Sequence, residues 1–422
     1  MSPFRRAARF WTPPVVLALL SVGVLSCGGG SPPPLRIGAV FPLSGAQAPL
    51  GRQELEGVEL AAQLANRAGG VQGRPIDLEV KNLTNQSQAG STVAALRATG
   101  ASIVMGAYSS LLSIPVATAA AQAGLVYWET GAVADHLTGH VSPLVFRVGA
   151  SGTNLGTNSA NFAASVLAPR LGLPAERTRV SVVFENDAYG QSVAGAAVRT
   201  ARTDGMQLVL DRAYDAYQPD WGQVMSAVVA SRPDILIIAS YIPDGVAFRR
   251  AMLADHVRVG AMIGSTMAEC GPSFGNELGP QAVGVFASDR PEGDFNPSAL
   301  DPAGKRDYAA LAKAWKQATG QASPTEEALS GFSAAWALFH DVLPHATSLT
   351  PTAVAAAAGA VDLPLGELPN GAGLRFATGP NQGQNLAAAA VIWQWQATRH
   401  SVVVWPAVYA TGGVRLVPLP AS

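Results

Sequence analysis

The sequence predicts an α/β protein in which mainly parallel sheets are covered by helices on both faces. Apolar, β-branched runs alternate with helical stripes along the chain, which is the pattern of βα units. These runs carry few charges, as expected of strands that are buried on both faces. The chain has 422 residues, of which 48% are apolar, so it can bury large cores, and we expect two.

The opening unit between Leu35 and Val80 shows this pattern most clearly. Leu35–Phe41 is an apolar run with no charge after Arg36, which predicts a buried strand. Apolar residues at spacings of three and four then form a helix stripe, namely Leu55, Val58, Ala62 and Ala65. Gly69-Gly70 ends this helix, since glycine tolerates the left-handed geometry of a C-cap. A second strand follows at 76–80.

The rest of the chain continues the alternation. Further strands are predicted at 102–106, 125–129, 180–185, 206–210, 235–240 and 261–264. Helices are predicted at 89–99, 115–123, 190–203, 221–230 and 245–254. Asp220 is placed to cap the helix that begins at Trp221. After a loop rich in Pro, Asp and Gly at 291–302, we expect two more helices within 308–320 and 326–343 and two closing strands within 385–396 and 402–410.

The N-terminal segment predicts export and lipid attachment. Three arginines within the first nine residues precede a short apolar stretch at 15–25, and "VLSC" at 24–27 fits a lipoprotein cleavage box. Cleavage after residue 26 would leave Cys27 as the lipid-bearing first residue. The apolar stretch is about half of the roughly 20 residues that a transmembrane helix needs. The alternative is an ordinary secretory signal in which Cys27 is incidental. Residues 27–34 then read as a flexible tether.

Charge and cysteine content exclude several other classes of protein and site. A formal net charge of −1 gives no basic field for nucleic acid. After cleavage only Cys270 lies in the folded region, so an intramolecular disulfide is excluded. His136 and His140 have a spacing that could bind metal on a helix, but Gly139 and the missing third ligand favour a solvated turn. We expect no cofactor.

Several segments, in order, resemble the periplasmic binding proteins of the leucine/isoleucine/valine type, the extracytoplasmic receptors of amino-acid ABC importers. They are "IGAVFPLSG", "EGVELA", "NRAGGVQGRPIDLEV", "VMGAYSS" and "GLVYWETGAVADHLT". The resemblance covers residues 35–396. It implies a type 1 fold of two Rossmann-like lobes joined by a three-crossover hinge, with lobes at 35–150 plus 290–375 and at 151–289 plus 376–422. It also implies a monomer that closes on a small-molecule ligand and meets a membrane permease.

Ser109 and Ser110 follow the strand predicted at 102–106, where ligands of open α/β sheets bind. A hydroxyl beside the free amides of a helix start can hold a carboxylate. Ser110 matches the family serine that binds the ligand's carboxylate, whereas either serine could instead only cap the next helix.

Tyr189 and Tyr241 occupy corresponding loop positions after two strands, and the resemblance implies that both line the cleft from the second lobe. The alternative for each is burial in the core. Trp128 and Tyr108 have the same two options, with the core favoured for Trp128.

The sequence departs from the family at the position that holds an α-amino group. In the segment Gly131, Ala132 and Val133, a valine stands where a threonine is usual, and Thr266 replaces the acidic residue of the second lobe. A buried ammonium without a counter-charge costs several kcal/mol. The pocket is therefore not tuned to plain α-amino acids, or its anion lies elsewhere. Glu129 is the first candidate for that anion and Glu269 the second, while a structural hydrogen bond is the alternative for Glu129.

The sequence thus predicts a substrate-binding lipoprotein of an ABC importer, bound to the cell envelope and directed to a small carboxylate, amide or related amino acid. No GxSxG, HExxH or P-loop motif is present, so we do not expect an enzyme. A ligand-sensing module of the same fold is the alternative, because one fold serves transport and signalling.

Overall fold

Two sheets organise the chain in the computed structural model, which describes residues 32–139, 142–416 and 419. The predicted lipid attachment at Cys27 lies outside these residues. The first sheet has the order β2-β1-β3-β4-β5, and all its strands are parallel. Its strands are β1 (Leu35–Phe41), β2 (Ile76–Asn82), β3 (Ile103–Gly106), β4 (Val126–Glu129) and β5 (Val145–Arg147).

The second sheet has the order β14-β13-β10-β9-β8-β6-β7. Its strands are β6 (Arg179–Glu185), β7 (Gln207–Tyr214), β8 (Ile235–Ala239), β9 (Ala261–Ser265), β10 (Phe286–Asp289), β13 (Val391–Ala397) and β14 (His400–Trp405). The pairings from β7 to β10 are parallel, whereas β13 is antiparallel to both β10 and β14. A short pair, β11 (Asp362–Leu363) and β12 (Leu374–Arg375), stands apart.

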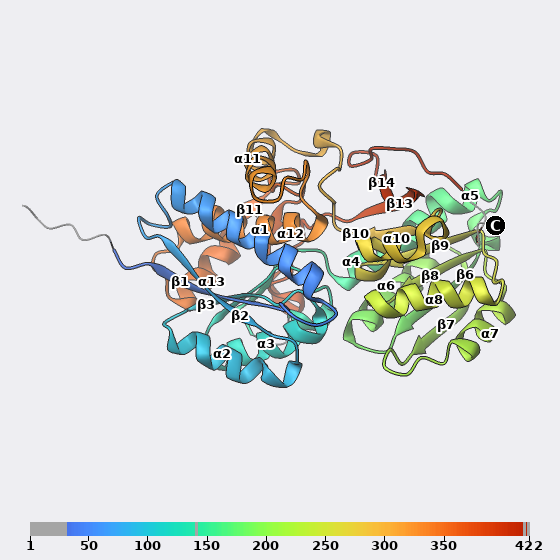
Figure 1. Ribbon diagram of the computed structural model, residues 1–422, viewed down its shortest axis with the longest axis horizontal. Helices are drawn as coiled ribbons and strands as arrows, with labels where there is room; N and C mark the ends of the chain where they lie inside the picture. The colour runs from blue at the N-terminus through green and yellow to red at the C-terminus, as the bar shows by residue number, and fades with distance from the viewer. Residues whose placement is uncertain (1–31, 140–141, 417–418, 420–422) are drawn as a thin grey trace, which may run out of the picture. The chain divides into compact units, whose positions relative to one another are not determined.

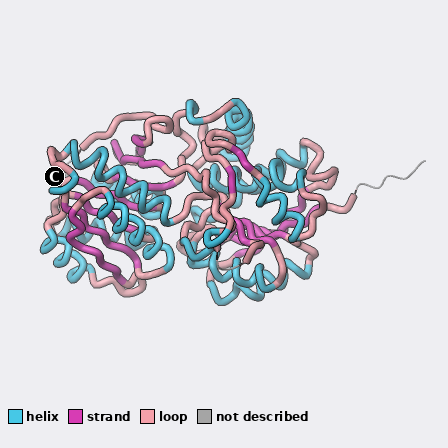
Figure 2. The backbone as a smooth tube through the Cα atoms, turned by 180° about the vertical axis from the view of Figure 1, so that it is seen from behind, coloured by secondary structure: helices cyan, strands magenta, loops and turns pink. Residues whose placement is uncertain are grey.

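Helices cover both faces of each sheet, as Figures 1 and 2 show. The first sheet lies between one layer that contains α1 (Ala48–Arg67) and α12 (Glu326–Trp336) and another made by α2 (Ala89–Ala98) and α3 (Ser110–Gln122). Helices α11 (Pro302–Thr319) and α13 (Pro351–Ala360) pack on the first of these layers. The second sheet is covered by α4 (Gly152–Phe162) and α6 (Ala188–Thr203) on one face and by α7 (Trp221–Ser231), α8 (Ile242–Ala254) and α10 (Pro272–Leu278) on the other. Short helices α5 (Ala168–Arg170) and α9 (Met267–Cys270) complete the set.

Helices α1 and α12 touch backbone to backbone, although they are about 270 residues apart in the chain. A Cβ atom on Gly57 would lie 2.0 Å from the carbonyl oxygen of Ala328, and one on Gly331 would lie 2.1 Å from that of Glu54. Only glycine permits this approach. It ties the C-terminal helices to the first sheet, and it brings Glu54 into the interior, where the residue is 0% exposed.

The chain passes between the two sheets three times, after β5, after β10 and after β12, which confirms the predicted three-crossover fold. The boundaries of the lobes remain a proposal. Phe376 packs its ring at 5.5 Å from Trp128 and 4.9 Å from Phe146, and Gln384 bridges to Arg147 of β5. These contacts favour a third crossing just before Val391 rather than at Phe376.

Most predicted elements are present, with shifted ends. The helix expected from Pro115 begins at Ser110, so Pro115 lies inside it and cannot donate the helical hydrogen bond to the carbonyl of Leu111. β7 runs on to Tyr214, past Asp211 and Arg212, since an edge strand that pairs only with β6 can carry charged residues. Asp220 caps α7 as predicted, accepting from the Gln223 amide at 2.9 Å. The strands β5 and β10 and the helices α4 and α13 were not predicted. Among the described residues, no helix is long and apolar enough to cross a membrane.

Candidate ligand-binding site

A small cavity lies between the two sheets, at the carboxyl ends of their parallel strands. It is lined by Tyr108, Ser110, Gly131, Ala132, Val133, Tyr189, Tyr241, Thr266 and Arg290. We call it the ligand cavity. Seven of the nine predicted site residues are in this set, and Ser109 and Glu129 are not. The volume of this cavity is about 10 Å³, counted as the space open to the centre of a water molecule. It therefore has room for about one water molecule.

Ser110 is the first residue of α3 and brings a hydroxyl and the helix N-terminus to the cavity wall. Its Oγ accepts from the Ala134 amide at 3.0 Å, and no acceptor for its own proton is found among the described residues. Ser109 does not line the ligand cavity, so its predicted ligand role stays a prediction. It occupies the N-cap position, but its hydroxyl makes no capping bond and is buried away from the cavity. The hydroxyl of Ser110 is therefore the one available to a ligand.

Tyr189 and Tyr241 form one aromatic wall, with ring centroids 5.0 Å apart. The Tyr189 hydroxyl donates to the Ser265 carbonyl and accepts from Thr266 Oγ1 at 2.9 Å. The Tyr241 hydroxyl donates to Asp187 Oδ2 at 3.0 Å. Since both hydroxyls have protein partners, the two residues offer mainly ring surface to the cavity. Tyr189 is also 1% exposed, so core burial and cavity lining hold for it together.

Arg290, which follows β10, was not predicted as a site residue. Its Nη1 donates to the Gly131 carbonyl at 3.0 Å and to Ser330 Oγ at 3.1 Å. Its Nε lies 2.5 Å from Glu326 Oε1, and no partner for Nη2 is found among the described residues. Burial opposes the guanidinium charge, but Glu326 and Asp289 together raise the pKa of Arg290. The cation is therefore fixed at the wall of the cavity.

Glu129, predicted as a ligand partner, does not line the ligand cavity. The residue is 0% exposed, and its Oε1 accepts from the amides of Thr130, Gly131 and Ala132 at 3.0, 2.8 and 2.7 Å. Its Oε2 accepts from the Tyr127 hydroxyl at 2.7 Å. These four bonds use the carboxylate to shape the loop after β4. These bonds fit the structural alternative for Glu129, and its ligand role stays a prediction.

Glu269 also lies away from the ligand cavity. It is 0% exposed and accepts from Ser240 Oγ at 3.0 Å. Val133 and Thr266 do line the cavity, as predicted, so no carboxylate side chain is among its lining residues. Trp128 is in the core, where its indole donates to the Ala334 carbonyl at 2.8 Å, whereas Tyr108 lines the cavity.

A second, wider cavity of about 190 Å³ opens beyond Tyr241, the residue that the two cavities share. Leu111 of α3 lines it from the first sheet's side, and Tyr217 and Ile242 line it from the second. Two acids also border it. Burial raises the pKa of Glu185 to about 9 and that of Asp244 to about 6. We call this space the outer cavity, and its lining is mostly apolar.

The described residues hold no group of three or more His, Cys, Asp and Glu side chains that could bind a metal ion. His136 is exposed at the 3₁₀ turn Asp135–Leu137, and His140 lies outside the described residues.

Comparisons with known proteins agree with this architecture. The family model described as periplasmic binding protein matches residues 34–399. The Leu/Ile/Val-binding protein homolog 8 of Brucella abortus is 28% identical over 367 residues, which are 86% of this chain and 88% of that protein. Among solved structures, the substrate-binding protein LivJ of Streptococcus pneumoniae in complex with isoleucine has a TM-score of 0.71 at 17% identity, covering 88% of this chain and 100% of that one.

A solute-binding protein of R. palustris in complex with benzoate is similar in fold, with a TM-score of 0.70 at 18% identity over 90% of this chain and 98% of that one. The model match covers most of the chain and agrees with its two sheets and three crossings. The chain therefore belongs to the periplasmic binding protein family.

Proposed function

We propose that the protein is the extracytoplasmic substrate-binding component of an ABC importer and captures a small carboxylate or amide in the ligand cavity. The observation that carries this proposal is the lining of that cavity. Ser110 and Arg290 supply polar groups, and Tyr189 and Tyr241 supply ring surface from the second sheet's side. A site made from both sides suits a protein whose lobes close on their ligand.

The polar end of the ligand meets three donors. They are the Ser110 hydroxyl, the free amides of the first turn of α3, and Nη2 of Arg290. A helix N-terminus favours negative charge, and hydrogen bonds to an ionised group are about twice as strong as neutral ones. A carboxylate satisfies these donors best, and an amide oxygen satisfies them in part.

The ligand lacks an α-ammonium group in this proposal. No carboxylate lines the ligand cavity, and the nearest replacement, Glu129, spends its oxygens on the chain itself. An ammonium there would lose its hydration without gaining a counter-charge. The similar fold that holds benzoate is consistent with an acid of this kind, whereas the one that holds isoleucine represents the ordinary amino-acid receptor.

Ligand entry requires the two sheets to move apart. The ligand cavity has room for about one water molecule, which is too little for a branched acid. Three chain crossings between the sheets form a hinge that can supply this motion. The outer cavity, whose lining is mostly apolar, would hold the hydrocarbon end of the ligand. Closure would then signal occupancy to a permease, with the protein as a monomer tethered through Cys27.

Calorimetry with three matched probes tests the ligand class: leucine, 4-methylvalerate, which is leucine without its amino group, and 4-methylvaleramide. We expect the acid to bind more tightly than the amide and leucine to bind least. Ser110→Ala should weaken binding of the acid by about 1–3 kcal/mol, the usual cost of an unmatched buried polar group. Ser109→Ala is the control, since its hydroxyl has no partner and does not line the cavity. Tighter binding of leucine than of the acid would refute the proposed class.

Fractionation of cells tests the proposed location. The wild-type protein should remain with membranes, and Cys27→Ser should give an unprocessed precursor or a protein released from the membrane. Uptake of labelled ligand into cells, with and without the gene, separates import from sensing. Unchanged uptake after deletion would favour the sensing alternative.

A further inference from the structure

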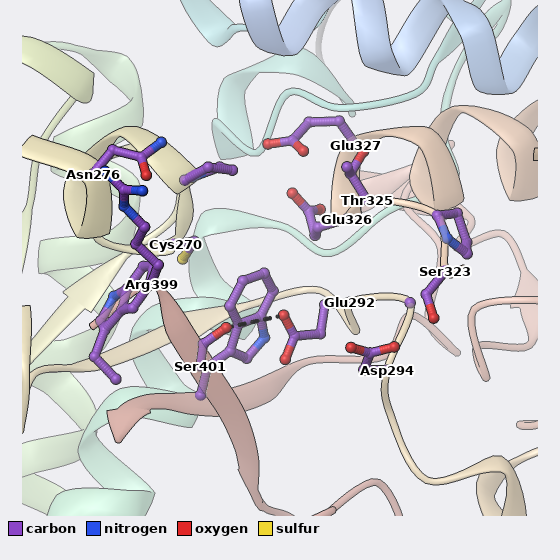
Figure 3. A pocket seen from close by; sticks show the side chains of 15 residues that line it. Cys270, Asn276, Glu292, Asp294, Ser323, Thr325, Glu326, Glu327, Arg399 and Ser401 are labelled. Atoms are coloured by element: carbon purple, nitrogen blue, oxygen red, sulfur yellow. Dashed lines mark hydrogen bonds between the residues drawn. The ribbon is translucent and has the colours of Figure 1, made fainter. Parts of the chain in front are cut away.

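A second site of different character lies at the hinge, on α10, the crossing after β10, the start of α12 and the β13–β14 hairpin. It is a cavity of about 300 Å³, which is at the lower end of the range for small-molecule sites. We call it the hinge cavity. Figure 3 shows that its side chains converge from these separate segments. It shares no lining residue with the ligand cavity.

The hinge cavity is strongly acidic. Four carboxylates line it, from Glu292, Asp294, Glu326 and Glu327. Arg399, which is exposed on the hairpin turn, is the single cationic side chain among its lining residues. Two of the acids already have partners, because Glu326 is paired with Arg290 and Glu292 accepts from Ser401 Oγ at 3.2 Å.

Glu327 is the residue that points to a ligand. The residue is only 4% exposed and forms no ion pair among the described residues, although its own amide, the charge of Arg290 and Glu326 partly offset the burial of its carboxylate. In Figure 3 it projects from the start of α12 toward the cavity. Burial raises the pKa of Glu327 to about 7 and that of Glu292 to about 7. Arg290 offsets this burial only in part, because its Nε is paired with Glu326, and a cation in the cavity would lower the remaining cost of burying the carboxylate.

The rest of the lining fits an organic cation better than a metal ion. Trp393 and Trp395 both border the cavity, and both indole N–H groups are already used, by the carbonyls of Arg290 at 3.2 Å and Glu269 at 2.7 Å. The rings therefore offer apolar surface and cation–π attraction rather than hydrogen bonds. The carboxylates are not grouped as metal ligands, since no such group exists among the described residues.

We propose that the hinge cavity binds an organic cation, a primary ammonium or guanidinium on an apolar or aromatic body. The cationic group lies by the Glu327 and Glu292 carboxylates, and the body lies against the two tryptophans. The site shares no lining residue with the ligand cavity, so its existence does not depend on the function proposed above.

Calorimetry with tryptamine as the probe tests this site, with tryptophol as a neutral molecule of the same shape. We expect tryptamine to bind and tryptophol to bind at least tenfold more weakly. Glu327→Gln should reduce the affinity for tryptamine by about tenfold or more. Glu176→Gln is the matched control, because it removes an exposed carboxylate far from both cavities in the chain and should leave the affinity unchanged.

Three further arms make the outcome decisive. Asp294→Asn changes an exposed side chain at the cavity and should weaken tryptamine two- to fivefold even if Glu327→Gln fails to fold. Ser110→Ala should leave tryptamine binding unchanged, which separates this site from the ligand cavity. Equal binding of tryptophol, no effect of either carboxylate variant, loss of binding in Ser110→Ala, or displacement of tryptamine by millimolar Mg²⁺ would each overturn the proposal.

Discussion

The ligand cavity and the hinge cavity are built beside the same crossing of the chain but carry opposite charge. The ligand cavity is lined by one guanidinium and by no carboxylate, whereas the hinge cavity is lined by four carboxylates and one exposed arginine. Arg290 belongs to the first cavity and Glu326 to the second, and these two residues form an ion pair with an N···O distance of 2.5 Å. One buried ion pair thus stands between a site suited to anions and a site suited to cations.

This difference suggests why the pair is kept. Replacing a buried ion pair by apolar residues is often neutral or stabilising, so the pair is weak support for stability alone. Here each member gives its own cavity a charge that an apolar side chain could not give. We infer that the pair serves specificity on both sides of the hinge, at some cost in folding free energy.

The largest expected effect follows from breaking the pair. Arg290→Met leaves Glu326 and Asp289 buried without their counter-charge, and it should lower the free energy of unfolding by about 3–5 kcal/mol. Urea unfolding at pH 7.5 measures this. Adding Glu326→Gln to the variant should restore at least about 1 kcal/mol, because it removes one stranded charge.

The exposed pair of Arg250 and Glu277 is the control for Arg290→Met. Its atoms are 3.1 Å apart and its side chains are 55% and 48% exposed. Arg250→Met should cost less than about 1 kcal/mol, as exposed pairs do. Similar losses in the two methionine variants would mean that burial of the Arg290 pair does not govern stability.

Glu54, a buried acid near Arg290, should make the free energy of unfolding depend on pH. Burial raises its pKa from 4.5 to about 8, against the opposing effects of the Arg290 charge and the Thr130 hydroxyl, and the residue is fully buried. The folded protein therefore holds a proton on Glu54 that the unfolded chain releases, and the contribution of this residue to stability falls as the pH rises from 4.5 to 8. Glu54→Gln should be more stable than wild type by about 4–5 kcal/mol at pH 9 and by less than about 1 kcal/mol at pH 5.

Urea unfolding of wild type and Glu54→Gln at the two pH values measures this difference. Other buried acids titrate in both proteins, so only the difference between the two reports on Glu54. The same gain at pH 5 and pH 9 would contradict a proton on Glu54 and favour a packing effect of the amide.

Much of the ligand cavity could be predicted from the sequence, because its residues follow strands that are visible as apolar runs. Ser110, Tyr189 and Tyr241 all come shortly after such runs, and the structure brings them together. Arg290 could not be placed in the same way. Its strand, β10, is only four residues long and was not recognised, although the apolar run that ends at Asp289-Arg290 was a signal for it.

Orientation and long-range packing account for the rest. Glu129 stands at the end of a strand whichever way its side chain turns, and only the conformation of the following loop decides that its oxygens meet three amides. Glu54 lies in an ordinary helical stripe. Its burial arises from the contact of α1 with α12 at Gly331, which no local pattern reveals.

Glu129→Gln tests whether Glu129 is structural, with an effect of intermediate size. The substitution replaces an ionised acceptor of four hydrogen bonds with an amide whose nitrogen faces the amides or the Tyr127 hydroxyl. We expect a loss of about 2 kcal/mol in the free energy of unfolding. The order of affinities among 4-methylvalerate, its amide and leucine should stay the same in calorimetry. A changed order without loss of stability would return Glu129 to the ligand site.

The smallest effect, and the sharpest test of the comparison, is coupling between the two cavities. A cation near Glu326 shares that carboxylate with Arg290, so Arg290 is freer to attract an anion in the ligand cavity. Saturating tryptamine should therefore tighten binding of 4-methylvalerate about fivefold, or about 1 kcal/mol, and the acid should tighten tryptamine by the same factor, since coupling free energies are reciprocal. Calorimetry in both orders of addition measures the two coupling factors.

The variant Glu326→Gln is the control for this coupling. Its coupling factor should fall toward one while both probes still bind, because Glu327 and Ser110 remain in place. Coupling that survives this substitution, or that weakens the second ligand, would show that the ion pair does not connect the two sites.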